Sequence, residues 1–189
     1  MTRGSSSRPW VAFIDVGVVV AIAAIAYYVI ARGPAVDPNA PHRLTNDVAI
    51  SGQLMPGAVK ALRDAGFRTI VNMRPDGEVP GQPNYGEMQS AVQGAGLAYG
   101  YAPQKLNAVS PVSIEALGST LTRLPKPALL YSEPASRAAQ AWALAEASKP
   151  GGLDAAAIES AIDHAGAGPM SPDLSVQIRS RVSARKAAK

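Results

Sequence analysis

Two short segments of this chain gather polar side chains that could do chemistry. Arg74-Pro-Asp-Gly-Glu78 follows a β-branched run and has the composition of a tight turn. Ser132-Glu-Pro-Ala-Ser-Arg137 follows a short apolar run. A hydroxyl such as that of Ser132 is a poor nucleophile without an adjacent base, and neither His42 nor His164 lies next to it in the sequence. If Ser132 is a nucleophile, its base must therefore come from a residue that is distant in the sequence and lies beside it in the folded chain.

Missing residues exclude several other chemistries. The 189 residues contain no cysteine, which removes disulfides, cysteine-ligated zinc, iron–sulfur clusters and any thiolate nucleophile. The sequence has no Gly-rich dinucleotide loop, Walker loop, His-Glu-x-x-His motif, Gly-x-Ser-x-Gly elbow or cluster of histidines. We therefore expect neither a cofactor nor a bound metal.

Strand-like and helix-like segments alternate along most of the chain. Strands are expected at 48–50, 68–73, 97–102 and 127–131, and helices at 56–66, 85–95, 113–124 (capped by Ser113), 136–148 and 154–165. This alternation predicts an α/β domain with a mostly parallel sheet and helices on both faces. Sites in such sheets form in the loops at the carboxyl ends of the strands, so loops 74–84 and 132–137 are the expected site.

Five segments, in order, carry a resemblance to a known family. They are Ile50-Ser-Gly-Gln53, Gly66 to Glu78, Gly96-Leu-Ala-Tyr99, Pro127 to Arg137 and Trp142-Ala-Leu144. Together they resemble the bacterial phosphatase-like domain found beside beta-lactamase-type hydrolase domains, also described as a sulfur transferase. The resemblance covers roughly residues 43–170. It implies a three-layer, parallel-sheet domain of the rhodanese or dual-specificity phosphatase type.

The resemblance fails at the loop that would carry the chemistry. In that family the loop has the form Cys-Arg-Ser-Gly-Thr-Arg, with a thiolate at a helix N-terminus, inward backbone N–H groups and an arginine that holds the anion. Ser132 here replaces the cysteine, Glu133 adds negative charge, and Pro134 removes a backbone donor. Ala135 takes a glycine position, where a positive φ would be strained. With Ser136 and Arg137, these residues form a degenerate loop with no intact catalytic residue.

Arg74, Asp76 and Arg137 are the candidates for anion binding. The resemblance places the turn 74–78 beside the loop, with Arg74 as an anion contact and Asp76 as a proton donor. Composition alone fits a solvated Pro-Asp-Gly turn. Arg137 is either a retained anion contact, or an exposed arginine in the first turn of a helix, or an ion-pair partner of Glu133 or Asp76.

The N-terminal part predicts a membrane helix. Trp10 to Ile30 is apolar except for Asp15, is long enough to span a bilayer, and is flanked by Arg8 and Arg32. The alternative is a cleaved signal peptide, whose apolar core is ordinarily about 7–15 residues. The bias of positive charge favours an N-terminus in the cytoplasm and a main domain outside it. The chain is thus expected to be a single-pass protein of a bacterial inner membrane.

The net charge of +4 is concentrated at the two ends of the chain. Residues 1–32 carry +2 and residues 179–189 carry +5, which leaves −3 for residues 33–178. A mildly acidic folded part argues against a nucleic-acid partner. The basic end is either a solvated tail or a segment attracted to anionic lipid or nucleic acid.

The sequence predicts five consecutive parts. They are an N-terminal segment (1–9), a transmembrane helix (10–31), a linker (32–43), a phosphatase-like domain (44–170), and a C-terminal helix with a basic tail (171–189). We predict an inactive, membrane-anchored pseudophosphatase that acts as a binding or scaffolding module for a protein partner that the sequence does not identify. Two alternatives to this function remain.

One is an active ester hydrolase that uses Asp76, Arg74, Ser132 or Arg137 in a rearranged mechanism, and the other is an anion sensor without turnover. The stretch 102–107, where related phosphatases often keep an acidic residue, has no carboxylate.

Overall fold

The computed structural model describes residues 40–105 and 109–188. The expected membrane helix at residues 10–30 and most of the expected linker lie outside the described residues. Within the described part of the chain, no helix has both the length and the apolar character needed to cross a membrane.

The described residues form one mixed sheet. Its strands are β1 (His42–Arg43), β2 (Val48–Ser51), β3 (Thr69–Asn72), β4 (Ala98–Tyr101) and β5 (Ala128–Tyr131), in the order β1-β2-β5-β3-β4. β2, β5, β3 and β4 run parallel, as predicted, whereas β1 pairs antiparallel with β2. The two-residue strand β1 was not predicted, because it is too short to show a periodicity.

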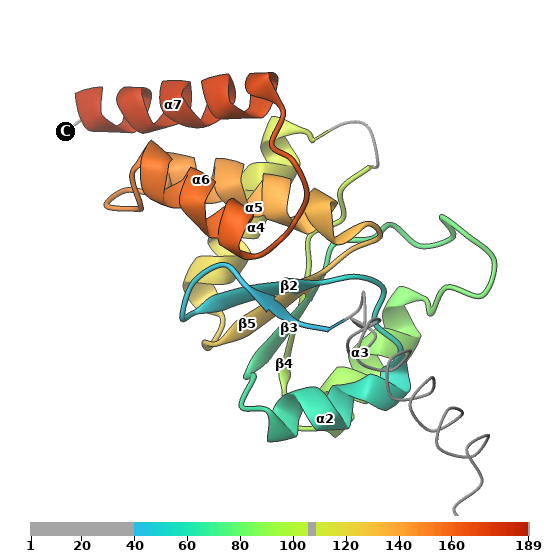
Figure 1. The fold of residues 1–189 in the computed structure, drawn as a ribbon. Coiled ribbons are helices and arrows are strands. Elements are labelled where there is room, and N and C mark those ends of the chain that lie inside the picture. The colour runs from blue at the N-terminus through green and yellow to red at the C-terminus, as the bar shows by residue number, and fades with distance from the viewer. Residues whose placement is uncertain (1–39, 106–108, 189) are drawn as a thin grey trace, which may run out of the picture. The chain divides into compact units, whose positions relative to one another are not determined.

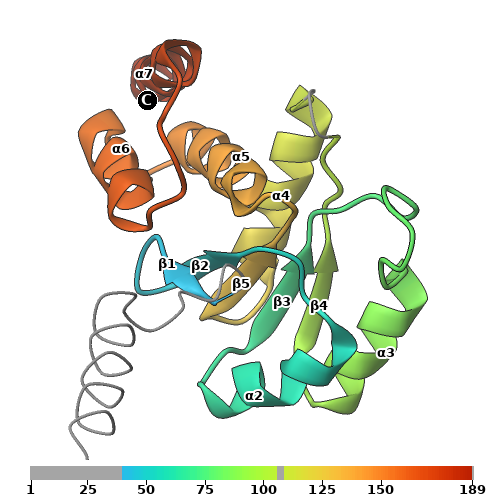
Figure 2. The same ribbon diagram turned by 45° about the vertical axis from the view of Figure 1, so that its right-hand side comes forward.

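Helices cover both faces of the sheet (Figures 1 and 2). The elements below the sheet in Figure 1 are η1 (Pro56–Ala58), α2 (Val59–Asp64) and α3 (Tyr85–Gly94), and those above it are α4 (Pro111–Arg123) and α5 (Ala135–Ser148). Two further helices, α6 (Ala155–His164) and α7 (Pro172–Ala187), pack against α5. A separate apolar core fills each side of the sheet.

Polar caps fix where most of these helices begin. Asn84 forms a capping box with Glu87 at the start of α3, and Asp154 caps α6. The expected cap at Ser113 is wrong. α4 begins one turn earlier, because Ser110 is followed by a proline at the first helical position, and the Ser110 hydroxyl accepts from the Ser113 N–H at 3.1 Å.

The C-terminal helix α7 is held by an apolar stripe and by one arginine. Leu174, Ile178 and Val182 are buried, as their spacing predicts. Arg185 donates to the carbonyl oxygens of Glu146 and Gly152 at 2.8 and 2.7 Å, with further bonds to those of Lys149 and Leu153. This arginine therefore satisfies carbonyl groups at and just after the C-terminal end of α5, so part of the basic end has a structural role.

Replacing Arg185 with alanine is expected to lower the free energy of unfolding by about 1–2 kcal/mol, because several carbonyl groups lose a charged donor. Arg179→Ala is the matched control. Arg179 forms an exposed pair with Glu159 at 3.1 Å, and exposed pairs are worth about 0–1 kcal/mol. Urea denaturation of both variants measures the difference, and equal losses would contradict the structural role of Arg185.

Candidate functional site

The two candidate loops meet at the carboxyl edge of the sheet, as the topology predicts. Loop 74–84 follows β3 and loop 132–137 follows β5, which is the neighbour of β3. An ion pair between Glu78 and Arg137 joins the two loops. Gln53, which follows β2, contacts Arg74 and Glu133. The site is therefore built from three adjacent strand ends.

Ser132 is fully buried, and its hydroxyl is held within its own loop. Its Oγ donates to the carbonyl oxygen of Pro134 at 2.7 Å and accepts from the backbone N–H of Ala138 at 3.0 Å. No histidine or carboxylate bonds to this hydroxyl among the described residues. His42 lies in β1, and His164 lies at the end of α6 where it bonds to Ser160. The hydroxyl therefore links the loop to the first turn of α5, and the described part of the chain places no base beside it.

The backbone of the loop enters α5 directly. Pro134 is the N-cap of the helix and Ala135 is its first residue, followed by the half-buried Ser136. The strain expected at Ala135 is wrong, because no described residue other than glycine has a positive φ. Alanine favours a helical conformation, so having alanine where the family has glycine causes no backbone strain at position 135.

Arg137 is buried, and both terminal nitrogens of its guanidinium donate hydrogen bonds. It is only 3% exposed, so the expectation of an exposed arginine is wrong. Nη1 donates to the Glu78 carboxylate and to the carbonyl oxygen of Gln104 at 2.8 Å. Nη2 donates to Glu78 Oε2 at 2.9 Å and to the carbonyl oxygen of Glu133 at 2.6 Å. The ion-pair partner is therefore Glu78, and not the side chain of Glu133 or Asp76.

Glu78 bridges both arginines of the site. Arg74 is also 3% exposed, and its Nε donates to Glu78 Oε2 at 2.8 Å. The Arg137 guanidinium is the chief cause that holds the pKa of Glu78 below its ordinary value; burial opposes it, and the Arg74 guanidinium adds to the lowering. This carboxylate already neutralises the positive charge that the two arginines would otherwise offer to an anionic ligand.

Asp76 lies at the exposed side of the same turn. Its Oδ1 accepts from the backbone N–H of Tyr85 at 2.8 Å, at the start of α3. It bonds to neither Ser132 nor Arg137 within the described ranges. This position fits the solvated turn that composition alone suggests, and the role of Asp76 as a proton donor stays a prediction.

Gln104 is a buried polar residue that the sequence did not single out. The residue is fully buried, and neither its Nε2 nor its Oε1 has a hydrogen-bond partner among the described residues. The Nε of Arg137 is likewise unpartnered. An unpaired buried amide costs about 1–3 kcal/mol. The only sequence signal was its place in the segment 102–107, where related phosphatases often keep an acidic residue.

Gln104→Met is therefore expected to raise the free energy of unfolding by about 1 kcal/mol, because methionine keeps the volume and removes the unpaired amide. Thermal denaturation of the variant and the parent measures the change. A loss of stability would mean that the amide has a partner in solution.

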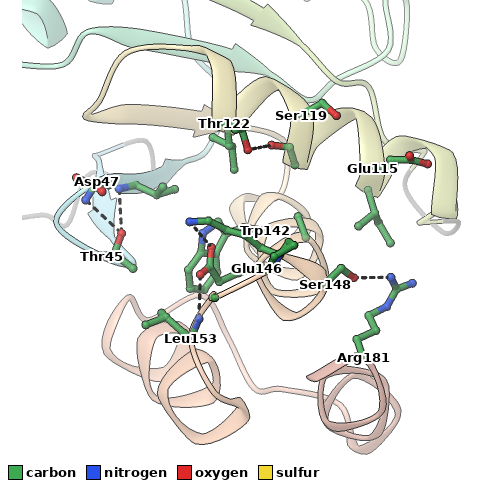
Figure 3. Close-up of a pocket in the computed structure, with 18 of the residues that line it drawn as sticks. Thr45, Asp47, Glu115, Ser119, Thr122, Trp142, Glu146, Ser148, Leu153 and Arg181 are labelled. Atoms are coloured by element: carbon green, nitrogen blue, oxygen red, sulfur yellow. Dashed lines mark hydrogen bonds and ion pairs between the residues drawn. The ribbon is translucent and has the colours of Figure 1, made fainter. Parts of the chain in front are cut away.

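A cavity of about 1340 Å³ lies elsewhere in the domain. Figure 3 shows it between α4, α5 and α7, with Trp142 at its centre and Arg181 bonded to Ser148 at one edge. Asp47, which also lines it, precedes β2. None of the residues that line the cavity belongs to loop 74–84 or loop 132–137. The cavity is separate from the candidate site.

Comparison with known proteins assigns the family. Residues 42–149 match the family described as "Beta-lactamase hydrolase-like protein, phosphatase-like domain", and the match covers more than half of the chain. The chain belongs to this family. A Beta-lactamase hydrolase-like protein of Agrobacterium fabrum is 32% identical over 105 residues, which is 56% of this chain and 24% of that protein. Its counterpart in Xylella fastidiosa (strain Temecula1) is 33% identical over 99 residues, which is 52% of this chain and 23% of that protein. The chain matches only about a quarter of the length of these relatives.

Solved structures share the fold of this phosphatase-like domain. A protein of Neisseria meningitidis classed with the phosphatases has a TM-score of 0.62 at 20% identity, covering 74% of this chain and 96% of its own. TpbA of P. aeruginosa, in complex with pTyr, has a TM-score of 0.58 at 20% identity, covering 83% and 97%. PTPMT1, in complex with PI(5)P, has a TM-score of 0.57 at 15% identity, covering 78% and 97%. These likenesses confirm a mixed α/β fold of the phosphatase type.

Proposed function

We propose that this chain is a membrane-anchored phosphatase-like domain that has lost catalysis and acts as a binding or scaffolding module. The observation that carries the proposal is the hydrogen bonding of Ser132. Its hydroxyl donates to the Pro134 carbonyl and accepts from the Ala138 N–H. An attacking hydroxyl needs a base to take its proton, and here that proton is bonded to a carbonyl oxygen, which is not a base.

The charges of the site support the same proposal. A phosphate group would have to displace the Glu78 carboxylate from Arg74 and Arg137, or bind beside it at the cost of repulsion. Glu133 adds a further carboxylate to the loop. Pro134 offers no N–H to an anion at the position where the family's loop has one.

The proposed anchor is the apolar segment 10–30. A single helix there would place the domain at a bacterial inner membrane, with the N-terminus in the cytoplasm and the domain outside it. Tethering restricts a domain to the membrane surface and raises its effective concentration for partners there. That role requires no chemistry from the domain.

One observation favours a second candidate, a sensor that binds an anion without turning it over. The Nε of Arg137 is buried and has no partner among the described residues. An oxyanion that reached this atom would supply the missing acceptor. Binding of such an anion is therefore the alternative outcome, and it is distinct from hydrolysis.

Turnover of p-nitrophenyl phosphate by the full chain in nonionic detergent tests the main proposal. We expect a rate equal to that of buffer for the parent chain. The variants Arg137→Ala, Ser132→Ala and Asp76→Asn should not change it. Turnover that exceeds the buffer rate, and that Ser132→Ala or Arg137→Ala abolishes in a folded variant, would overturn the proposal.

A further inference from the structure

Three large apolar side chains lie exposed at the carboxyl edge of the sheet, the edge that carries the degenerate loop. Met55 is 50% exposed, Val79 51% and Tyr101 37%. Met55 follows β2, Val79 lies in the loop after β3, and Tyr101 ends β4. Isolated exposed apolar residues are ordinary, but these three come from separate elements that meet at one edge of the sheet. With Asp76 and Glu133, they define what we call the carboxyl-edge surface.

Direct contacts connect the parts of the carboxyl-edge surface. The rings of Tyr85 and Tyr101 meet edge to face with centroids 5.0 Å apart, and the backbone N–H of Tyr85 donates to the Asp76 carboxylate. On the other side, the Glu133 carboxylate accepts from the Gln53 N–H at 3.3 Å. η1, which follows Met55, packs against α3. Tyr101, Asp76 and Glu133 are thus each held by contacts to neighbouring elements.

The exposed charge of this surface is negative. Asp76, Glu87 and Glu133 are exposed acids here, and Lys105 is an exposed base. Lys60, which lies five positions after Met55, is also exposed, but it is paired with Asp64. The two arginines of the site do not reverse this sign, because they are 3% exposed and share the Glu78 carboxylate. An edge that carries an anion-binding loop in related folds therefore presents acidic and apolar groups to the solvent.

We infer that the carboxyl-edge surface binds an extended basic segment of a partner protein, one in which arginine or lysine alternates with aliphatic residues. The inference rests on the proposed function, because an active site would keep this edge for its substrate. Charge selects the occupant: Asp76 and Glu133 attract cationic side chains. The exposed ring of Tyr101 accepts a guanidinium by a cation–π contact. Met55 and Val79 take the aliphatic side chains between the cations.

The same features reject an anionic segment. A phosphorylated or acidic peptide would meet Asp76 and Glu133 with like charge, and like-charge contacts suppress wrong partners. Arg74 and Arg137 cannot compensate for this repulsion, because both are buried and paired with Glu78. Preference for a phosphopeptide is therefore the result that would favour the opposite interpretation of this edge.

Fluorescence anisotropy with the full chain in nonionic detergent tests the inference. The probe is a fluorescein-labelled peptide containing Arg-Leu-Arg-Leu-Arg between glycine and serine residues. Two matched peptides carry glutamate in place of arginine, or one phosphotyrosine in a neutral sequence. The test variant is Tyr101→Ala with Glu133→Gln, and the control is Glu115→Gln, which removes an exposed acid from α4. Circular dichroism checks that each variant is folded, and the two single variants replace the double one if it is not.

We expect the basic peptide to bind, and the double variant to weaken its binding about tenfold, which is the loss of one cation–π contact and one charge pair. Glu115→Gln should leave the binding unchanged. Equal binding by the parent and the double variant, no binding of the basic peptide, or preference for the phosphotyrosine peptide would each overturn the inference. The turnover assay is independent of these results, so failure here leaves the loss of catalysis standing.

Discussion

Replacing Glu78 with glutamine is expected to lower the free energy of unfolding by about 3 kcal/mol. The change leaves Arg74 and Arg137, each 3% exposed, without the carboxylate that compensates them. Removing one member of a buried ion pair costs about 3–5 kcal/mol because the other charge stays buried and unpaired. The lower end applies here, because the side chain of Glu78 is 20% exposed and water can partly replace its charge. Urea denaturation measures the loss.

Glu133→Gln is the control for this variant. It removes the same charge from the same edge, but Glu133 is exposed and its carboxylate makes a single bond to a backbone N–H. We expect a change within about 0.5 kcal/mol. If both variants lose equal stability, or neither does, the Glu78 bridge is not the element that holds the two loops together.

The contribution of Glu78 should also depend on pH. Its pKa is lower in the folded chain than its ordinary value of 4.5, chiefly because of Arg137. A group with a depressed pKa stabilises the fold above its unfolded pKa, and this stabilisation is lost as the pH falls through the folded value. The stability difference between the parent and Glu78→Gln should therefore be constant above about pH 5.5 and shrink below pH 4.5. A difference that grows on acidification would contradict the assignment.

Replacing Trp142 with alanine should have an effect of similar size, about 3–5 kcal/mol. Trp142 lies in α5, is 1% exposed, and belongs to the core between the sheet and the outer helices. It also borders the cavity shown in Figure 3, so its removal enlarges an existing space that the neighbours cannot easily fill.

Leu153→Ala separates the core role of Trp142 from a role of the cavity. Leu153 lines the same cavity but is 36% exposed, so we expect a loss of about 1 kcal/mol or less. Thermal denaturation followed by circular dichroism compares the two variants. A small effect of Trp142→Ala would show that α5 is not the central element of this side of the domain.

The alternation of elements was readable from the sequence because local patterns determine it. The runs ending at Met73 and Tyr131 are β-branched or apolar, and the glycines at 66 and 96 end helical segments, so the order of strands and helices followed. Parallel pairing then placed the loops 74–84 and 132–137 at one edge without any further information. The antiparallel strand β1 was missed because two residues are too few to show a periodicity. The true cap of α4 was missed although Ser110 followed by a proline is a sequence signal for a helix start.

The pairing inside the site was not readable from the sequence. Glu78 lies 59 positions from Arg137, and only the path of the loop decides that it, rather than Asp76 or Glu133, reaches the guanidinium. The burial of Arg137 followed from this pairing, because a charged group becomes buried only with a partner. Likewise, the ease with which Ala135 replaces a glycine depends on α5 beginning at that residue.

A crystal structure of the full chain grown with tungstate tests the central claim most directly, since tungstate is a tetrahedral oxyanion of the kind a phosphatase loop cradles. The account predicts no tungstate at residues 132–137, with the Ser132 hydroxyl still bonded to Pro134 and Ala138 and with Glu78 still between Arg74 and Arg137. A tungstate ion held by several backbone N–H groups of this loop and by Arg137, with Glu78 displaced, would contradict it.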